Sequence, residues 1–482
     1  MEQDQPFIPW AVSRPVWLVL VLSLVAMAGC AVGPDFERPE TEMPAGWAGS
    51  TAAVGAQAGE STEASLAEWW TVFQDATLTS LIERAVESNL DLKLAEARIR
   101  EARAARGVAA SAFGPTADAT GSFRRSQATG NGPVANQYQA GFDAGWELDI
   151  FGGTRRAVEA ADADLQAAEE DRRDVLVTLT AEVARTYIEL RAFQQQLDIG
   201  QRNLAAQERS VELSEKRFQA GFVSSLDVAN AKAQVATTTA EIPLLEASVR
   251  QTIYSLSVLL ALDPAALVEE LSPPTAIPPA PPTVPVGVPS DLLRRRPDIR
   301  AAEAGIHATT ARIGVATADL FPKVNLAGSI GWQAGDLGSL FDTASRFSSL
   351  GPSVSWSLFQ SGRIRSNIEV QKALEEQSFI AYRQTVLAAL EEVEDALIAS
   401  EKEQERRHAL VEALDANRKA VDLATQLYSQ GQTDFLSVLD AQRSLYSSED
   451  ALAQSTRTVS TNLVALYKAL GGGWAAELAA QK

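Results

Sequence analysis

The sequence predicts an α+β membrane protein made of two copies of one unit, in which a helix leads into two β-strands and the strands lead into a long helical hairpin. Three observations predict this fold class. Segments about 200 residues apart match each other, which indicates an internal duplication. Each copy contains two runs in which apolar and polar residues alternate. Each pair of runs is followed by more than 60 residues without Pro.

Composition excludes several classes of function. The chain has 482 residues, with 42 Lys and Arg against 62 Asp and Glu and a formal net charge of −20, so we expect no nucleic acid partner. One Cys cannot form an internal disulfide, and one Cys with two His cannot complete a zinc site. The sequence contains no phosphate loop and no Gly-x-Ser-x-Gly motif, so we expect no catalytic residues, no metal and no cofactor.

The first residues resemble a lipoprotein signal peptide. Residues 16–28 are apolar except for Ser23, and the run stops at Ala28-Gly29-Cys30. We expect cleavage after residue 29 and a covalent lipid on Cys30, as in a bacterial lipoprotein box, with two or three acyl chains giving a stable anchor. The alternative is an ordinary signal peptide with an incidental Cys. Residues 30–76 then form a lipid-anchored extended segment and part of a collar. No later run of 18 apolar residues follows.

The duplication sets the division of the chain. Residues 91–115 align with residues 298–322 at a constant offset of 207, and further on the offset becomes 210, as in Trp146/Trp356. We assign the first repeat to residues 77–262, the second to 291–470 and a C-terminal tail to 471–482. The linker between them, 263–290, is rich in Pro, which forbids helix and favours an extended spacer that follows a surface. A flexible hinge is the alternative.

Each repeat opens with a helix, 77–111 in the first, and continues with two alternating runs. The runs are 9 to 11 residues long, apolar on one side and polar on the other, which is typical of transmembrane β-strands. Residues expected to face lipid are Phe142, Trp146, Leu326, Trp332, Val354 and Trp356. Two amphipathic hairpins on a soluble core are the alternative. Four strands cannot close a barrel, but three chains would supply twelve and leave a lumen, so we infer at least a trimer.

Long helices follow the strands, at 154–219 and 363–429. Apolar residues recur every seven positions in the first of them, from Leu176 to Phe218, which predicts a supercoil against neighbouring helices. The positions that should complete the heptad pattern include polar residues, Gln207 and Ser214. We therefore expect the helix to pack between neighbours in a wall that is exposed to water on one side. Each helix ends at a Gly, Gly221 or Gly431, and a second helix follows at 226–262 or 436–470.

Five motifs together resemble the outer-membrane efflux factor family, the TolC-like channels, and within it the lipid-anchored branch that serves resistance-nodulation-division pumps. The resemblance covers essentially the whole mature chain, and the one small departure is Ala76, where this branch usually has Pro. The motifs are CAVGPDFERP from Cys30, WWTVFQDATLTSLIERAVESNLDL from Trp69, GVPSDLLRRRPDIRAAEAGI from Gly287, YSQGQTDFLSVLDAQRSL from Tyr428 and LYKALGGGW from Leu466.

The resemblance implies a homotrimer with a twelve-stranded barrel in the outer membrane, continued by a helical tunnel in the periplasm. A collar made from the chain ends and the segment between the repeats surrounds the tunnel. An inner-membrane pump and a periplasmic adaptor deliver the substrate, so the expected protein is a passive, gated conduit for drugs or other small molecules. The alternative from another class is a non-conducting, lipid-anchored helical scaffold of the cell envelope. An enzyme ranks behind both.

The resemblance also implies where the gate and the docking sites lie. The family closes its tunnel just after the second hairpin tip, which corresponds here to residues 435–443. Leu436, Asp440 and Arg443 share one helix face there, so a trimer would place an apolar ring and an acidic ring on its axis. Asp440 and Arg443 as an ordinary surface ion pair are the alternative. The adaptor is expected to dock at both tips, around Arg217, Gly221, Ser224, Leu226 and Gly431.

Overall fold

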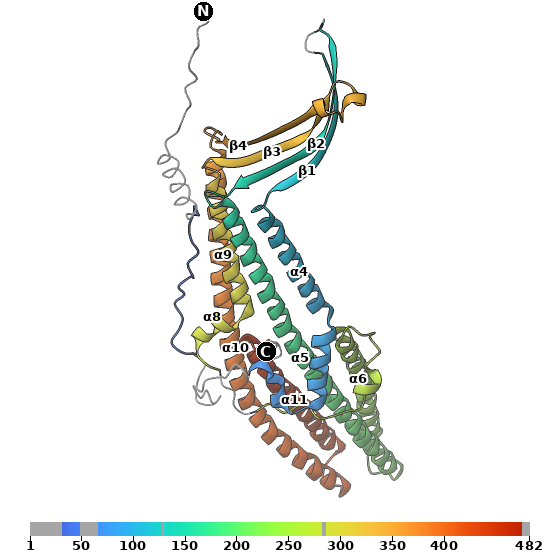
Figure 1. The fold of residues 1–482 in the computed structure, drawn as a ribbon. Coiled ribbons are helices and arrows are strands. Elements are labelled where there is room, and N and C mark those ends of the chain that lie inside the picture. Colours follow the sequence, from blue (N-terminus) through green and yellow to red (C-terminus); the bar gives the residue numbers. More distant parts are fainter. Residues whose placement is uncertain (1–30, 49–65, 128–129, 131, 282–285, 475–482) are drawn as a thin grey trace, which may run out of the picture. The chain divides into compact units, whose positions relative to one another are not determined.

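The computed structural model describes residues 31–48, 66–127, 130, 132–281 and 286–474 (Figure 1). It forms two compact units. Among the described residues, the first unit contains those within 31–40, 98–169 and 301–383, and the second contains those within 41–97, 170–300 and 384–474. The predicted signal peptide and Cys30 lie outside the described residues.

The first unit contains one antiparallel sheet with the strand order β1-β2-β3-β4 (Figure 1). Its strands are β1 (Thr116–Gln127), β2 (Val134–Leu148), β3 (Lys323–Ala334) and β4 (Arg346–Ser355). The strands have 12, 15, 12 and 10 residues, so three of them exceed the predicted 9 to 11. The prediction was too short because it followed the apolar stretch, whereas pairing continues into polar residues, as in Arg125 opposite Asn136.

A short irregular connection joins β3 to β4. It contains the 3-10 turns η3 (Leu337–Ser339) and η4 (Thr343–Ser345), and Asp336 caps the first by accepting a hydrogen bond from the backbone N–H of Gly338. In the described residues β1 and β4 are each paired on one side only. The sheet therefore has two open edges.

The helix predicted for residues 77–111 is two helices. They are α3 (Ala76–Ser88) and α4 (Leu90–Ser111), separated at Asn89, whose backbone leaves the helical region at ψ 138°. The Asn89 side chain accepts hydrogen bonds from the backbone N–H groups of Asp91 and Leu92, and thereby caps α4. The sequence prediction missed this break because the apolar pattern continues across it. The corresponding helix of the second half is α9 (Pro297–Ala318).

The long helical hairpins are confirmed. The first is made of α5 (Gly153–Gln219) and α6 (Ser225–Leu259), and the second of α10 (Arg363–Ser429) and α11 (Phe435–Ala469). Each observed end lies within three residues of the predicted one. Gly221 and Gly431 mark the ends of α5 and α10 locally, whereas α6 continues through Pro243. Among the described residues, no helix is long and apolar enough to cross a membrane.

The core of the second unit gathers around the apolar stripe of α5. Leu176, Val183 and Leu190 are almost completely buried, as the seven-residue repeat predicts. The expectation of a wet side at Gln207 and Ser214 was wrong, because both are buried as well. A helix of the other hairpin packs beside this stretch, where Gln442 of α11 donates a hydrogen bond to Ser210 at 3.0 Å.

Two of the sequence motifs meet in this core. The indole ring of Trp69, in the 3-10 helix η1 (Trp69–Phe73), is fully buried and stacks on Tyr467 with 5.3 Å between ring centroids. Gly472 and Gly473 lie against Trp69 so closely that a Cβ atom at either would come within about 3.2 Å of the ring, and Gly473 also has φ +103°. This close approach explains the run of glycines at the end of the chain.

The described part of the linker is not free of helix, contrary to the prediction. It contains α7 (Val268–Leu271), the 3-10 helix η2 (Pro289–Asp291) and α8 (Leu292–Arg295). No Pro lies between Pro264 and Pro273, so this part of the linker can form one helical turn. Gln194 and Arg191 of α5 donate hydrogen bonds to the carbonyls of Leu271 and Pro273, which holds this segment in place.

Candidate functional site

The sheet has one apolar and one polar face. Phe142 lies opposite Ile330, Trp146 opposite Leu326 and Val324 opposite Val354, so these side chains share one face. All the residues that the sequence analysis assigned to lipid lie on this side or continue it. Phe142, Trp146, Val354 and Trp356 are exposed, whereas Leu326 and Trp332 are half-buried. A single chain therefore presents a broad apolar surface that has no cover in the described residues.

The opposite face carries polar and acidic side chains in rows across the strands. Asp118 pairs with Asp143, which pairs with Ser329, and Ser329 pairs with Ser349. Thr120 donates a hydrogen bond to Asp143 at 2.8 Å. Asp149 does not belong to this face. It follows β2 and accepts hydrogen bonds from the backbone N–H groups of Thr154 and Arg155 at the start of α5.

Trp146 and Trp356 occupy matching positions in the two repeats and make matching contacts. The indole N–H of Trp146 donates to the carbonyl of Phe113 at 2.9 Å, and that of Trp356 donates to the carbonyl of Leu320 at 3.0 Å. Each acceptor lies two residues before the Pro that precedes a strand. An indole with an exposed ring and a satisfied N–H suits a membrane interface.

The segment after Cys30 is fixed on the first unit. The backbone N–H of Val32 donates to the carbonyl of Phe151 at 3.0 Å. The buried side chain of Arg156 donates to Asp35 at 2.6 Å and to the carbonyl of Val32. Gly33, at φ +96°, approaches Gly314 so closely that any Cβ would clash with its backbone. Residues 32–35 are therefore held at the junction of β2 and α5.

The hairpin turns have the predicted glycines. Gly221 and Gly431 have φ +79° and +74°, the left-handed conformation of a helix C′ residue. Ser224 begins α6 with a capping box, in which its side chain accepts from the N–H of Asp227 and the Asp227 carboxylate accepts from the N–H of Ser224. Leu226 is exposed.

Arg217 has a different environment from the one expected of a docking residue. Its guanidinium lies over the ring of Tyr428 at 4.6 Å and donates to the carbonyl of Tyr428 at 2.6 Å. It therefore joins the end of α5 to the end of α10 and satisfies a carbonyl of the last helical turn. The apolar surface at this tip comes instead from Phe218, Phe222 and Leu226, which are all exposed.

The three predicted gate residues lie on the first turns of α11. Leu436 and Asp440 are exposed, and Arg443 is more than half exposed at its side chain. The Arg443 guanidinium is 4.0 Å from Asp440, at the outer limit of an ion pair. Its shorter contact is a hydrogen bond of 2.7 Å from Nε to Gln234 Oε1 on α6. Arg443 therefore ties the second hairpin to the first within one chain.

Comparison with known proteins then identifies the family. The family model described as outer membrane efflux protein matches residues 81–262 and 288–472. The chain belongs to the outer membrane efflux protein family.

Individual members of this family are similar over nearly their whole length. The solvent efflux pump outer membrane protein SrpC of Pseudomonas putida is 33% identical over 94% of this chain and 97% of its own. The pyoverdine export outer membrane protein OpmQ of Pseudomonas putida is 36% identical over 90% and 93%. The solved outer-membrane channel OprN has a TM-score of 0.85 at 39% identity, covering 92% of this chain and all of its own. The fold is that of TolC-like outer-membrane channels.

The sequence analysis did not identify two residues that join the two hairpins. Gln234 and Glu241 are seven positions apart on α6 and face Arg443 and Tyr446 on α11. The hydroxyl of Tyr446 donates to Glu241 at 3.1 Å, and burial together with the charge of Glu241 raises the pKa of Tyr446 to about 12, so the hydroxyl keeps its proton. The seven-residue spacing of two polar residues was the available signal.

Neither of the two His residues gathers further ligands. His307 lies 3.1 Å from Glu159 and stacks on Phe36, and His408 lies near Glu412 on the same helix. Within the described ranges there is no group of three or more His, Cys, Asp or Glu side chains that could hold a metal ion.

Proposed function

We propose that this protein is the outer-membrane channel of a tripartite efflux system. It conducts drugs or other small molecules passively from an inner-membrane pump and a periplasmic adaptor to the exterior, with its strands in the outer membrane and its helical tunnel in the periplasm. The observation that carries the proposal is the sheet, which has an exposed apolar face, a polar face and two open edges. A lipid-anchored scaffold that conducts nothing has no use for such a sheet, whereas a barrel wall requires it.

The working form is a homotrimer with a twelve-stranded barrel. The open edge of β4 in one copy pairs with the open edge of β1 in the next, which leaves no unsatisfied edge in lipid. The duplication predicts the register. Within the chain Asp143 pairs with Ser329. In the other repeat, the position that matches Asp143 of β2 is Ser353 of β4, at the offset of 210, and the position that matches Ser329 of β3 is Ser122 of β1, at the offset of 207. The equivalent pair between two copies is therefore Ser353 of one copy and Ser122 of its neighbour.

This register is testable by disulfide formation. A variant with Ser122→Cys and Ser353→Cys, made in Cys30→Ser to remove the other thiol, is expected to form covalent dimers and trimers on oxidation. The reason is that paired strand residues lie about 5 Å apart, within disulfide reach. A variant with Ser122→Cys and Ser349→Cys, displaced by four residues along β4, is the matched control and should remain monomeric on denaturing gels. Equal cross-linking in both variants contradicts the register, and none in either contradicts the trimeric barrel.

We place the periplasmic gate at Leu436, Asp440 and Arg443, with Gln234 as an additional partner. Rings of Leu436 and Asp440 on a threefold axis would exclude water and attract cations, respectively. The hydrogen bond from Arg443 to Gln234 supports this assignment, because it restrains the second hairpin, which carries Leu436 and Asp440.

Loss of this restraint should open the gate. Asp440→Ala combined with Arg443→Ala is expected to raise the single-channel conductance several-fold in planar bilayers. Glu369→Ala with Lys372→Ala removes an exposed i,i+3 pair within α10 and serves as control. An unchanged conductance in the gate variant, or an equal rise in the control, contradicts the assignment.

The remaining sites follow from the same arrangement. The adaptor docks at the two tips, on the exposed apolar side chains near Leu226 and on the turns at Gly221, Ser224 and Gly431, while Arg217 braces the tips from within. Leu226→Asp should weaken adaptor capture by the purified channel, and unchanged capture would count against this surface. A covalent lipid on Cys30, such as palmitate, anchors the chain to the membrane. Mass spectrometry of the mature protein and of Cys30→Ala tests for the acyl groups.

A further inference from the structure

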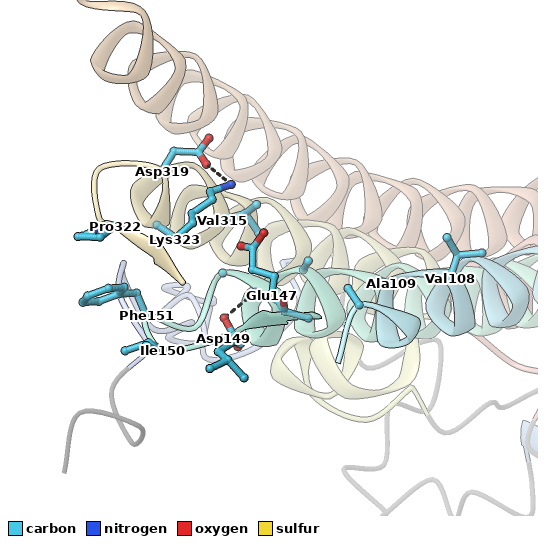
Figure 2. A pocket seen from close by; sticks show the side chains of 16 residues that line it. Val108, Ala109, Glu147, Asp149, Ile150, Phe151, Val315, Asp319, Pro322 and Lys323 are labelled. Carbon is cyan, nitrogen blue, oxygen red and sulfur yellow. Dashed lines mark hydrogen bonds and ion pairs between the residues drawn. The ribbon is translucent and has the colours of Figure 1, made fainter. Parts of the chain in front are cut away.

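A cavity of about 280 Å³ lies where β2 leads into α5 (Figure 2). Its apolar lining comes from Val108 and Ala109 of α4, Val315 of α9 and the residues that follow β2. Its charged lining consists of Glu147, Asp149, Asp319 and Lys323, all belonging to the first unit. A half-open cavity with apolar walls and few charged groups is the usual form of a small-molecule site, and this one is at the small end of the range.

Two of the three carboxylates in the lining have a basic partner. Asp149 pairs with Arg155 at 3.1 Å, in addition to its bonds with the start of α5. Asp319 pairs with Lys323 at 3.1 Å, as the dashed line in Figure 2 marks. Glu147 differs, since it makes no hydrogen bond or ion pair with any residue that the structure describes. Glu147 and Val315 both line the cavity, so it contains one uncompensated negative charge together with apolar side chains.

The position of Glu147 on the sheet gives access to the site. Glu147 lies opposite Asn325, which lies opposite Ser353, so it belongs to the polar face of the sheet. Its neighbour Trp146 belongs to the apolar face. A solute that moves along the polar face can therefore reach the cavity.

We propose that this cavity is a transient binding site for small organic cations, meaning molecules with one positive charge and an apolar body. Its role in export rests on the proposed channel function. A divalent metal ion suits the site poorly, because Ca²⁺ and Mg²⁺ need six or more oxygen ligands and only one unpaired carboxylate is present. Binding through one charge and a small apolar area is weak, and weak binding is what a conduit requires for release.

The test measures binding directly, so that it does not depend on conduction. The full-length protein in detergent is titrated with phenyltrimethylammonium and, separately, with benzenesulfonate, an anion of similar size, and saturation-transfer NMR reports contact. The cation is expected to bind with a Kd of roughly millimolar and the anion not to bind. Glu147→Gln should weaken cation binding by about tenfold, and Glu147→Asp should retain it. Ala112→Leu, which narrows the cavity and keeps the carboxylate, should also weaken it.

Asp118→Asn is the matched control, because it removes one carboxylate from the same face of the sheet outside the cavity lining. It should leave cation binding unchanged. If Asp118→Asn and Glu147→Gln weakened cation binding equally, the attraction would come from the overall negative charge of the polar face, and the proposal would be overturned. Equal binding of cation and anion, or no binding of the cation, would overturn it as well. A protein that binds the cation but never conducts would support the site and contradict the channel.

Discussion

At the scale of single residues, Arg296 explains why the motif RRRPDIR belongs to this fold. Its guanidinium donates to both carboxylate oxygens of Asp298, to Glu392 on α10 and to the carbonyl of Ala469 at the end of α11. Burial alone would lower the pKa of Arg296, but the hydrogen bonds and charges of Asp298 and Glu392 raise it above its usual value. One side chain therefore connects the start of α9 with both helices of the second hairpin.

Removal of this connection should destabilise the second unit. Arg296→Met keeps the length of the side chain but leaves Asp298 and Glu392 unpaired, at a cost of roughly 2 kcal/mol in the free energy of unfolding. Arg202→Met breaks an exposed pair with Asp198 and should cost at most about 0.5 kcal/mol. Denaturant unfolding followed by circular dichroism compares the two. Equal midpoints would contradict the role assigned to Arg296.

Asp174 on α5 predicts a pH dependence. Burial raises the pKa of its carboxyl, and the charge of Asp298 adds to the shift, against the opposing effect of Arg296 and Lys468. A raised pKa means that the folded state binds this proton more tightly than the unfolded state. The contribution of Asp174 to stability is therefore most favourable at low pH and falls as the pH rises through the folded-state pKa.

Replacement of Asp174 should reverse this loss. Asp174→Asn is expected to raise the unfolding midpoint above wild type at pH 7 and to leave it unchanged near pH 3, where both states of the wild-type carboxyl are largely protonated. The measurement is denaturant unfolding of both proteins across this range. A difference that stays constant with pH would rule out the electrostatic explanation.

At the scale of elements, the two hairpin turns depend on glycine. Gly221 and Gly431 have positive φ, so replacement by Ala should lower the stability of the turn by about 1 kcal/mol through backbone strain. Steric contact adds nothing at Gly221, since no described atom lies within 4 Å of the added Cβ. Gly221→Ala and Gly431→Ala should each speed local hydrogen exchange at their own turn by about fivefold. Gly305→Ala, inside α9 with equally open surroundings, should be neutral or stabilising. The same loss of protection at Gly305 would contradict the argument.

The elements also show which structure a sequence can predict. The ends of α5 and α10 could be placed closely, because Gly residues and the lack of Pro are local signals. The break at Asn89 was missed, since the apolar periodicity runs through it and only the capping side chain marks it. Likewise, Ser214 was expected to be exposed to solvent, because nothing in the sequence of its own helix indicates that the other hairpin buries it.

Contacts at the candidate site show the same limit. The partners of Arg217 and Arg443 lie 211 and 209 positions away in the chain, so no spacing rule links them. The sequence pattern paired Arg443 with Asp440, its neighbour on α11, although the structure places them 4.0 Å apart. Only the packing of the two hairpins reveals Gln234 as the closer partner.

At the scale of the whole molecule, the two open sheet edges and the exposed apolar face mean that one chain is not the complete structure. The fold of a single subunit was predictable, because the duplication can be recognised from matching segments and the strands from the alternation of apolar and polar residues. In the trimer that we propose, the partner strands come from other copies, and the reason for it is the need to pair the edges rather than any motif. A surplus of acid, at a net charge of −20, further predicts that the assembled pore prefers cations.

The central claim, a conducting channel, is tested most directly by the wild-type protein in planar bilayers under a KCl gradient. We predict discrete conductance steps and a reversal potential displaced toward that of K⁺, because in the proposed channel acidic side chains on the polar face of the sheet and at Asp440 line the path. The absence of steps above the lipid background would contradict the channel and favour a scaffold. Steps with a reversal potential displaced toward that of Cl⁻ would contradict the assignment of the acidic face to the lumen.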